Sequence, residues 1–217
     1  MSNAGPSSNV QIMLPSLAFF IAALVLAVSP GPGITYVVAR TAAGGRAEGL
    51  PSCVGTGLGG MLHVGAAALG LSVLLAQSAV AFSVVKYIGA AYLVYLGIRL
   101  LLSRAAFTPV RAKPTGAGRA LLEGILVEAL NVKTALFFLA FLPQFLLSGP
   151  SVVLQLVVMG TVCVVLNTLV DVVAVLGAAR LLSSEATVRR RSKLLNKASG
   201  LTLVGLGLYV AASKRGA

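Results

Sequence analysis

A Pro-Gly-Pro interruption inside a long hydrophobic segment is the feature that most constrains the fold of this chain. Residues 14–39 are long enough to cross a lipid bilayer, which takes about 20 residues, but Pro30, Gly31 and Pro32 lie within them. Each proline removes a backbone donor and clashes with the preceding turn. Broken helices of this kind hold substrates and ions in secondary transporters; a purely structural kink is the alternative.

Composition places the chain among integral membrane proteins. Of its 217 residues, 58% are hydrophobic and only 10% are charged, whereas a soluble domain carries about 25% charged residues. Six hydrophobic segments predict an all-α membrane protein with six transmembrane helices. These segments cover residues 14–39, 50–76, 79–102, 120–147, 152–179 and 195–212. We therefore expect one integral membrane domain over residues 1–217, without a sizeable soluble part.

The net charge of +12 comes mainly from short connections between the hydrophobic segments. The basic residues gather in residues 40–49, 104–119 and 180–197, while the other two connections carry no charge. Because cytoplasmic loops are enriched in lysine and arginine, both termini are predicted to lie outside, although Lys214 and Arg215 fit this less well. These residues form no folded basic face, so we expect the lipid bilayer and not nucleic acid as a partner.

The chain divides into two similar halves. Residues 14–102 and 120–212 each contain three predicted spans, and the Pro- and Gly-containing linker 103–119 joins them. A shift of about one hundred residues places the Pro-Gly-Pro segment over Asn131, Val132 and Lys133. Because three is an odd number, the second half must enter the membrane from the opposite side. The prediction is an inverted repeat with its site at the interface of the halves, near the midplane.

Several motifs together resemble the LysE/RhtB family of amino-acid exporters over about residues 17–210. They are Pro30-Gly31-Pro32, the glycines Gly55, Gly59 and Gly70, the segment Asn131-Val132-Lys133, and the run FLAFLPQF at residues 138–145. The family usually has Asn-Pro-Lys in the fourth span, so Val132 leaves open whether that helix is broken. Exporters of basic amino acids in this family carry acidic residues where this chain has Gly60 and Phe137, which favours a neutral substrate.

The resemblance implies a function. It implies a multi-pass protein of the bacterial inner membrane that exports amino acids or their derivatives in exchange for protons, driven by the proton motive force. Such a protein is not an enzyme and needs no cofactor. The small-residue faces around Gly55 and Gly59 allow close helix packing, either within a subunit or in a homo-oligomer.

Ionisable residues inside the predicted spans are functional candidates, because each costs about 2.5–3.5 kcal/mol at a helix centre. They are His63, Lys86, Glu123, Glu128, Lys133 and Asp171. Lys86 and Glu123 lie near span ends, where we expect them to reach the interface. We assign proton coupling first to Asp171 and then to His63. We assign substrate binding to Pro30, Gly31, Pro32, Asn131, Lys133 and Asn167, with Lys133 favouring a carboxylate.

Four alternatives remain open at this point. Lys133 and Asp171 can form a structural ion pair, and His63 can be a hydrogen-bonded packing residue. Cys53 and Cys163 occupy similar positions in the two halves, which raises the alternative of a membrane thiol-disulfide electron conduit; a non-transporting scaffold is a further one. One histidine and two cysteines give no metal-site spacing, so no metal is expected.

Overall fold

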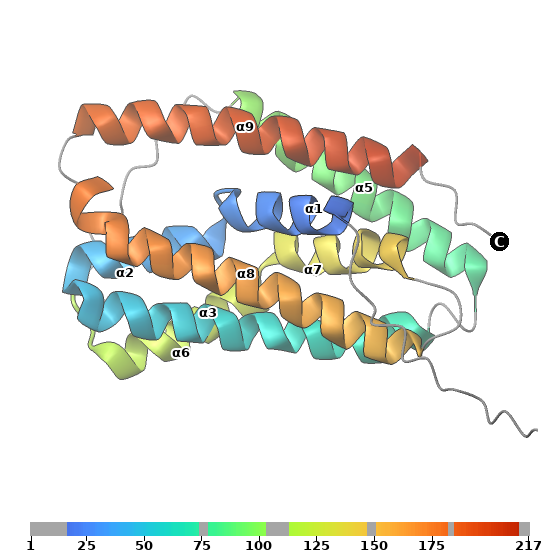
Figure 1. Cartoon of the computed structure of the whole chain (residues 1–217), viewed down its shortest axis with the longest axis horizontal. Coiled ribbons are helices and arrows are strands. Elements are labelled where there is room, and N and C mark those ends of the chain that lie inside the picture. Colours follow the sequence, from blue (N-terminus) through green and yellow to red (C-terminus); the bar gives the residue numbers. More distant parts are fainter. Residues whose placement is uncertain (1–16, 74–77, 103–112, 147–150, 182–184, 213–217) are drawn as a thin grey trace, which may run out of the picture.

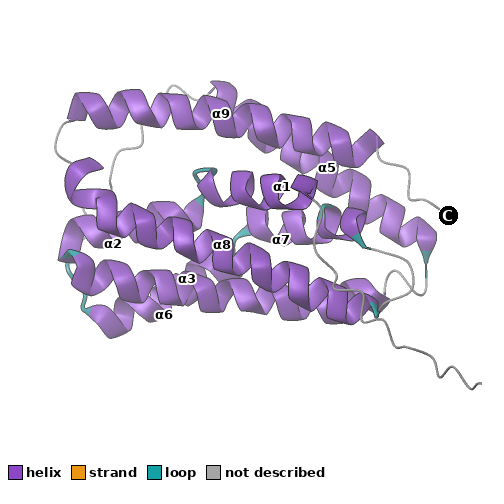
Figure 2. Ribbon diagram, in the orientation of Figure 1, coloured by secondary structure: helices purple, strands orange, loops and turns teal. Residues whose placement is uncertain are grey.

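The computed structural model describes residues 17–73, 78–102, 113–146, 151–181 and 185–212, and every regular element within them is a helix (Figure 2). In chain order these are α1 (Leu17–Val28), α2 (Pro32–Gly44), α3 (Arg46–Ala66), the π-helix η1 (Ala67–Leu71), α5 (Ala79–Leu102), α6 (Ala117–Ala129), α7 (Val132–Ala140), the 3-10 helix η2 (Leu142–Phe145), α8 (Val152–Leu181) and α9 (Glu185–Ala212). The described part of each of the six predicted segments is therefore mainly helical, with breaks in the first and the fourth.

Three helical segments are long and apolar enough to cross a membrane on their own: Arg46–Leu71, Val80–Leu102 and Val152–Gly177. Two further spans result if each bent pair counts as one. The α1–α2 pair bends by 44°, and α6 with the helices after it bends by 46°. Helix α9, which contains the predicted sixth span, does not meet the same criteria. Six spans and an inverted repeat thus stay predictions.

The first break follows from its prolines. Helix α1 ends at Val28, Gly31 is extended, and Pro32 occupies the start of α2. Proline is favoured at the first position of a helix, where its missing N–H has no intrahelical partner. In a continuous helix the carbonyl of Leu26 would accept a hydrogen bond from residue 30. Pro30 cannot donate it, so this carbonyl must find another partner.

The second break forms without a proline. Helix α6 ends at Ala129, and Asn131 adopts an extended conformation before α7 begins at Val132. The Asn131 side chain accepts a hydrogen bond from the backbone N–H of Lys133 at 3.1 Å. Asparagine is among the best N-cap residues, and this contact satisfies one of the free donors at the start of α7. Asn131 therefore explains why the fourth segment is broken even though Val132 replaces the family's proline.

The helices form a bundle in which α1 and α7 lie between two groups of longer helices (Figure 1). Helix α3 packs against α6 and α8, and α5 packs against α9. Helix α8 also contacts α1 and α2, while α5 contacts α7. The two broken elements are thus held on opposite sides by unbroken ones.

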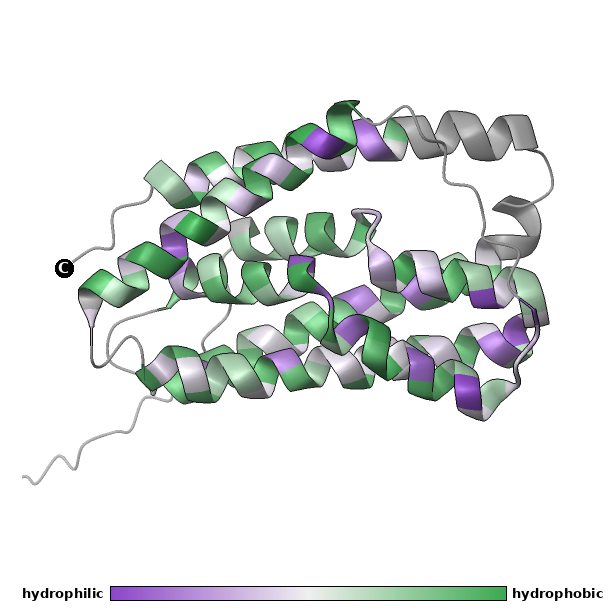
Figure 3. Cartoon of the chain, turned by 180° about the vertical axis from the view of Figure 1, so that it is seen from behind, coloured by the Kyte–Doolittle hydropathy of each residue, from purple (hydrophilic) through white to green (hydrophobic). Residues whose placement is uncertain are grey.

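Glycines bring the backbones of α3 and α6 together. A Cβ atom added at Gly59 would lie 2.5 Å from the backbone oxygen of Ile125, and one at Gly55 would clash with the backbone oxygen of Leu121. This small-residue face therefore packs within the subunit, so it provides no argument for a homo-oligomer. Hydrophobic residues make up most of the helices seen from the side shown in Figure 3. Hydrophilic residues gather at the end of the bundle where α2, α3 and α6 meet (Figure 3).

Candidate functional site

Lys133 fills the gap left by the first break. Its Nζ atom donates hydrogen bonds to the carbonyl oxygens of Ser29 at 2.8 Å and of Leu26 at 3.2 Å. A Cβ atom at Gly31 would lie 2.9 Å from this ammonium, so glycine is what lets the lysine approach. A cation at a helix C-terminus meets free carbonyls and the negative end of the helix dipole. Lys133, from the second half, thus caps α1 in the first half.

The alternative ion pair between Lys133 and Asp171 does not form in this structure. Lys133 takes part in none of the ion pairs within 4.0 Å that join described residues. Lys133 nevertheless interacts electrostatically with both Glu128 and Asp171. The three charges therefore belong to one neighbourhood, which we call the central cluster (Glu128, Lys133 and Asp171).

His63 forms a hydrogen bond at the second break. Its Nε2 atom lies 2.8 Å from the backbone oxygen of Glu128, near the end of α6. Because a carbonyl oxygen only accepts, Nε2 carries the hydrogen in this contact. This hydrogen bond is what the packing alternative predicts, and proton relay by His63 stays a prediction. Both broken helices, α1 and α6, thus have terminal carbonyls satisfied by a side chain from elsewhere in the chain.

Glu128 is buried, with only 4% of its surface exposed, and lies between the starts of two helices. Its Oε1 accepts a hydrogen bond from Thr134 at 2.7 Å, and its Oε2 accepts one from the Asn131 amide at 3.0 Å. On its other side, Oε2 faces Gly33 in the first turn of α2, where a Cβ atom would lie 2.6 Å away. The N-termini of α2 and α7 both favour a negative charge here. Glu128 was an ionisable candidate from the sequence but was not assigned to the site.

Asp171, on α8, has no exposed surface. Its Oδ2 lies 3.0 Å from the hydroxyl of Thr56, and that hydroxyl also lies 3.0 Å from the backbone oxygen of Cys53. The other carboxylate oxygen, Oδ1, has no hydrogen-bond partner in the described part of the chain. The buried hydroxyl of Ser29, at the first break, also lacks one. Buried polar atoms without partners are rare and call for an explanation.

A small cavity of about 20 Å³ lies beside these groups. This is room for about one water molecule. Its polar lining comes from α3, the second break and α8, namely Thr56, Glu128, Thr134, Asn167 and Thr168. Asn167, assigned to substrate binding from the sequence, therefore faces the same space as Glu128. Pro30, Gly31 and Pro32 do not line it but shape the break beside it.

Two other expectations from the sequence, on Lys86 and on the two cysteines, can be compared with the structure. Lys86 is only 7% exposed, so it is buried in the protein and does not reach out to an interface as predicted. Cys53 and Cys163 are both buried and free, and they lie in separate hydrophobic clusters. That arrangement gives no support to a thiol-disulfide conduit. No group of three or more histidine, cysteine or acidic residues suited to a metal occurs among the described residues.

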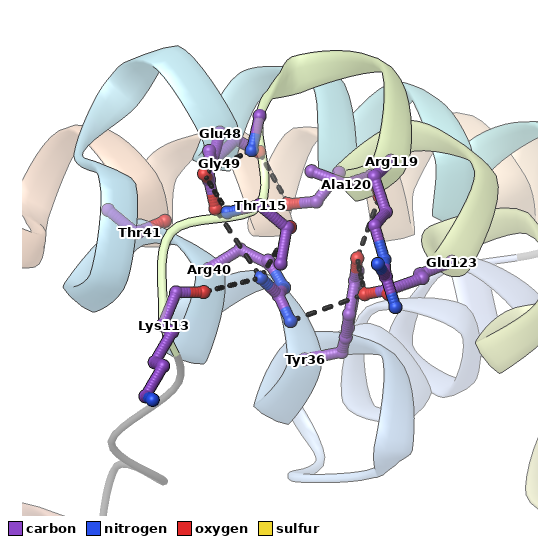
Figure 4. Close-up of polar contacts among 12 residues, drawn as sticks. Tyr36, Arg40, Thr41, Glu48, Gly49, Lys113, Thr115, Arg119, Ala120 and Glu123 are labelled. Atoms are coloured by element: carbon purple, nitrogen blue, oxygen red, sulfur yellow. Dashed lines mark hydrogen bonds and ion pairs between the residues drawn. The ribbon is translucent and has the colours of Figure 1, made fainter.

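A second set of charges, which the sequence did not predict, lies where α2, the start of α3 and the segment before α6 come together (Figure 4). We call it the end network; it consists of Tyr36, Arg40, Glu48, Arg119, Glu123 and the segment 113–116. Glu48 accepts hydrogen bonds from the backbone N–H groups of Thr115 at 2.6 Å and of Gly116 at 2.7 Å. Two backbone donors converging on one carboxylate fix the segment before α6 against the start of α3.

Arg40 joins the remaining members of the end network. It donates to the hydroxyl of Thr115 at 2.7 Å and to the backbone oxygen of Lys113 at 3.1 Å. It also lies 3.2 Å from Glu123, which pairs with Arg119 at 2.8 Å. Connections one and three of the predicted topology therefore meet at the same end of the bundle. Helix α8 ends and α9 begins at this end too (Figure 1).

Two broken helices that meet at buried charges define a class of protein, the membrane transporters. The sequence matches the family described as LysE type translocator over residues 24–214, so the chain belongs to that family. It is 30% identical over 202 residues to an uncharacterized membrane protein of Vibrio cholerae, covering 91% of this chain and 97% of that protein. No solved structure matches the chain.

Two relatives have names that describe efflux. The homoserine/homoserine lactone efflux protein of Salmonella typhimurium is 30% identical over 203 residues, covering 91% of this chain and 96% of that protein. The leucine efflux protein of the same organism is 24% identical over 196 residues, covering 89% and 92%. The chain is thus a multi-pass membrane protein of a translocator family that includes amino-acid efflux proteins, and such proteins are not enzymes.

Proposed function

We propose that this chain exports neutral amino acids or their derivatives across the bacterial inner membrane, driven by the proton motive force. The observation that carries the proposal is the central cluster: two carboxylates and one ammonium, buried where two helix breaks meet and beside a cavity. Buried ionisable groups inside a membrane mark ion and substrate pathways. The named relatives act on homoserine, its lactone and leucine, whose side chains carry no charge.

The packing of the helices supports the inverted repeat on which alternating access would depend. The broken helix pairs α1–α2 and α6–α7 are each the first predicted span of a half. Helix α3 packs against α6 in the same way that α8 packs against α1 and α2, and α5 contacts α7 as α9 contacts α1. At the level of whole spans these contacts correspond when the two halves are exchanged, although α5 contacts the second helix of a break and α9 contacts the first. The end network joins basic connections one and three, which supports placing that end in the cytoplasm and both termini outside.

Asp171 is our choice for the residue that carries the coupling proton. The Thr56 hydroxyl has one hydrogen and two acceptors at equal distance, Asp171 and the backbone oxygen of Cys53. When Asp171 is ionised, the hydroxyl can donate to the carboxylate. When Asp171 is protonated, it can donate to the hydroxyl, which then donates to Cys53. Both protonation states are accommodated without moving a helix, whereas His63 is committed to a backbone oxygen.

We propose that Lys133 and Asn167 bind the substrate's carboxylate. An ammonium has three N–H donors, and the described contacts of Lys133 use two of them, on Leu26 and Ser29. The third donor is available for a carboxylate. A substrate held this way contacts the first break through Lys133 and α8 through Asn167. Pro30, Gly31, Pro32 and Asn131 contribute by keeping the two breaks open.

Efflux from intact cells tests the proposal. Cells that produce the chain are preloaded with leucine-containing dipeptides, which are hydrolysed inside, and leucine in the medium is followed with and without an uncoupler. We expect leucine to accumulate outside against its gradient and the uncoupler to stop this accumulation. Cells without the chain provide the control. Accumulation that the uncoupler leaves unchanged would contradict proton coupling, and no accumulation above the control would contradict leucine export.

A further inference from the structure

The charges in the central cluster do not balance. Glu128 and Asp171 are carboxylates, Lys133 is the one ammonium among them, and all three interact electrostatically. In their ordinary ionised forms they leave one negative charge uncompensated inside the bundle. An uncompensated buried charge is strongly unfavourable. The N-termini of α2 and α7 offset part of this negative charge, and a proton or the cationic group of a ligand can pair with the rest.

Glu128 is the carboxylate that a ligand can reach. It lines the cavity, whereas Asp171 does not and is connected to it through Thr56. A carboxylate has about four acceptor positions, and two neutral donors, Asn131 and Thr134, occupy one on each oxygen of Glu128. Acceptor capacity is left on both oxygens.

The chemistry around the cavity fits a primary ammonium group. Besides Glu128, its polar lining consists of three threonine hydroxyls and the amide of Asn167. These groups can all accept hydrogen bonds, and an ammonium has three to donate. The volume of about 20 Å³ holds one water molecule, and an ammonium group has about the same size. Lys133 does not occupy this role, because its own ammonium contacts the carbonyls of Leu26 and Ser29.

We propose that Glu128 binds the substrate's α-ammonium group and so makes the site select primary amines over 2-hydroxy acids of the same shape. This inference rests on the proposed function, the export of neutral amino acids. The groups that face Glu128 are His63 from α3, Lys133 and Asn131 at the second break, Asp171 from α8 and the first turn of α2. The substrate's ammonium then provides a partner for Glu128, while its carboxylate provides one for Lys133.

Binding to the purified full-length protein in detergent tests the inference separately from transport. Thermal stabilisation is measured with leucine, with 2-hydroxyisocaproate, which has a hydroxyl in place of the ammonium, and with isopentylamine, which lacks the carboxylate. We expect leucine and isopentylamine to stabilise the wild type, and 2-hydroxyisocaproate to do so far less. Glu128→Gln should weaken leucine and isopentylamine binding by about tenfold or more, since hydrogen bonds to charged groups contribute strongly.

Two further variants make the result specific. Glu128→Asp keeps the charge and should bind the amine better than Glu128→Gln does. Glu123→Gln, five residues earlier on the same helix, should keep the wild-type preference for amine over hydroxy acid. The inference is overturned if a folded Glu128→Gln protein keeps that preference. It is also overturned if the wild type binds the hydroxy acid as tightly as leucine, a measurement that needs no variant. Amine binding without uncoupler-sensitive export would instead refute the proposed function and support the role of Glu128.

Discussion

The end network and the central cluster are both sets of interacting charges, but they differ in how those charges are paired. In the end network Arg40 and Arg119 pair with Glu48 and Glu123, and each glutamate contacts an arginine within 4.0 Å. Lys113 contributes only its backbone oxygen, and its side chain is exposed. The central cluster has two carboxylates and one ammonium, with no ion pair within that distance. One set joins two connections at an end of the bundle; the other lies at the helix breaks.

The comparison separates stabilising charges from those available for function. Charges that only hold helices together are expected to be paired with opposite charges, because an unpaired buried charge destabilises the fold. An excess of carboxylates inside a bundle indicates that a proton or a ligand balances it during function. Variants in the central cluster should therefore affect transport more than folding, and variants in the end network the reverse.

The largest effect is expected for Asp171→Asn. The amide keeps the size of the side chain and its contact with Thr56 but cannot carry a proton. Export of leucine against its gradient should fall to the level of cells without the chain, while exchange of leucine across proteoliposomes continues. The two assays, uphill efflux and exchange, are run on the same variant at matched protein levels. Uphill export by Asp171→Asn would remove Asp171 from the coupling role.

A paired variant guards against misreading a folding defect. Asp171→Asn changes a fully buried, hydrogen-bonded side chain, so it can also lower the amount of protein. Lys133→Met with Asp171→Leu removes both charges. Normal protein levels without transport in this double variant would assign function to both residues. Recovered uphill transport would show that neither belongs to the site.

Replacing both Pro30 and Pro32 with alanine should abolish export while the protein still inserts. Residue 30 regains its N–H, the carbonyl of Leu26 regains its helical partner, and Lys133 loses one of its acceptors. Pro51→Ala is the matched control, because Pro51 lies inside the unbroken α3; its export should continue. Efflux is measured as above, with membrane levels of each variant. Full export by the double variant would reduce the first break to a structural bend.

Glu48→Ala should have a moderate effect, on stability rather than on binding. It leaves the backbone donors of Thr115 and Gly116 without their acceptor and takes one partner from Arg40. The melting temperature in detergent should fall by several degrees, while the remaining folded protein keeps its preference for amines. Arg119→Ala is the control, because Arg119 is 69% exposed and surface ion pairs contribute little. If Glu48→Ala lost amine binding at an unchanged melting temperature, the end network would have a role in binding, and its contrast with the central cluster would be wrong.

The smallest effect is expected for Cys53→Ser with Cys163→Ser. Both thiols are buried among hydrophobic side chains and belong to neither set of charges. Serine is similar in size, so export of leucine should stay close to the wild-type rate at equal protein levels, with some loss of stability from the buried hydroxyls. Loss of export in a correctly inserted double variant would revive the redox alternative.

The first break was predictable because proline has a fixed effect on any helix. The second was predictable only in position, since the N-cap of Asn131 replaces the expected proline. The role of Glu128 was hidden by its spacing: on a continuous helix, residues five apart do not face one another, and the break between Glu128 and Lys133 removes that rule. The Lys133–Asp171 pair was a reasonable alternative, but carbonyls freed at the first break attracted the ammonium.

The end network could not be predicted for a different reason. Its strongest contacts join Glu48 to backbone N–H groups 67 and 68 residues later. Every residue except proline has such a donor, so nothing in the sequence marks these two. Glycine at position 116, with a positive φ of 87°, makes the turn that presents them. Charges paired with other charges leave a pattern in a sequence; charges paired with backbone leave none.

The contact between Lys133 and the first break has a consequence for biosynthesis. The carbonyl of Leu26 and the ammonium that caps it are 107 residues apart. At about 5–20 residues per second, the ribosome adds Lys133 roughly 5–20 s after Leu26. During that interval the carbonyls at the first break lack the Lys133 ammonium, so water or the insertion machinery must provide their hydrogen-bond donors. The break is therefore completed late, and only when the second half arrives beside the first.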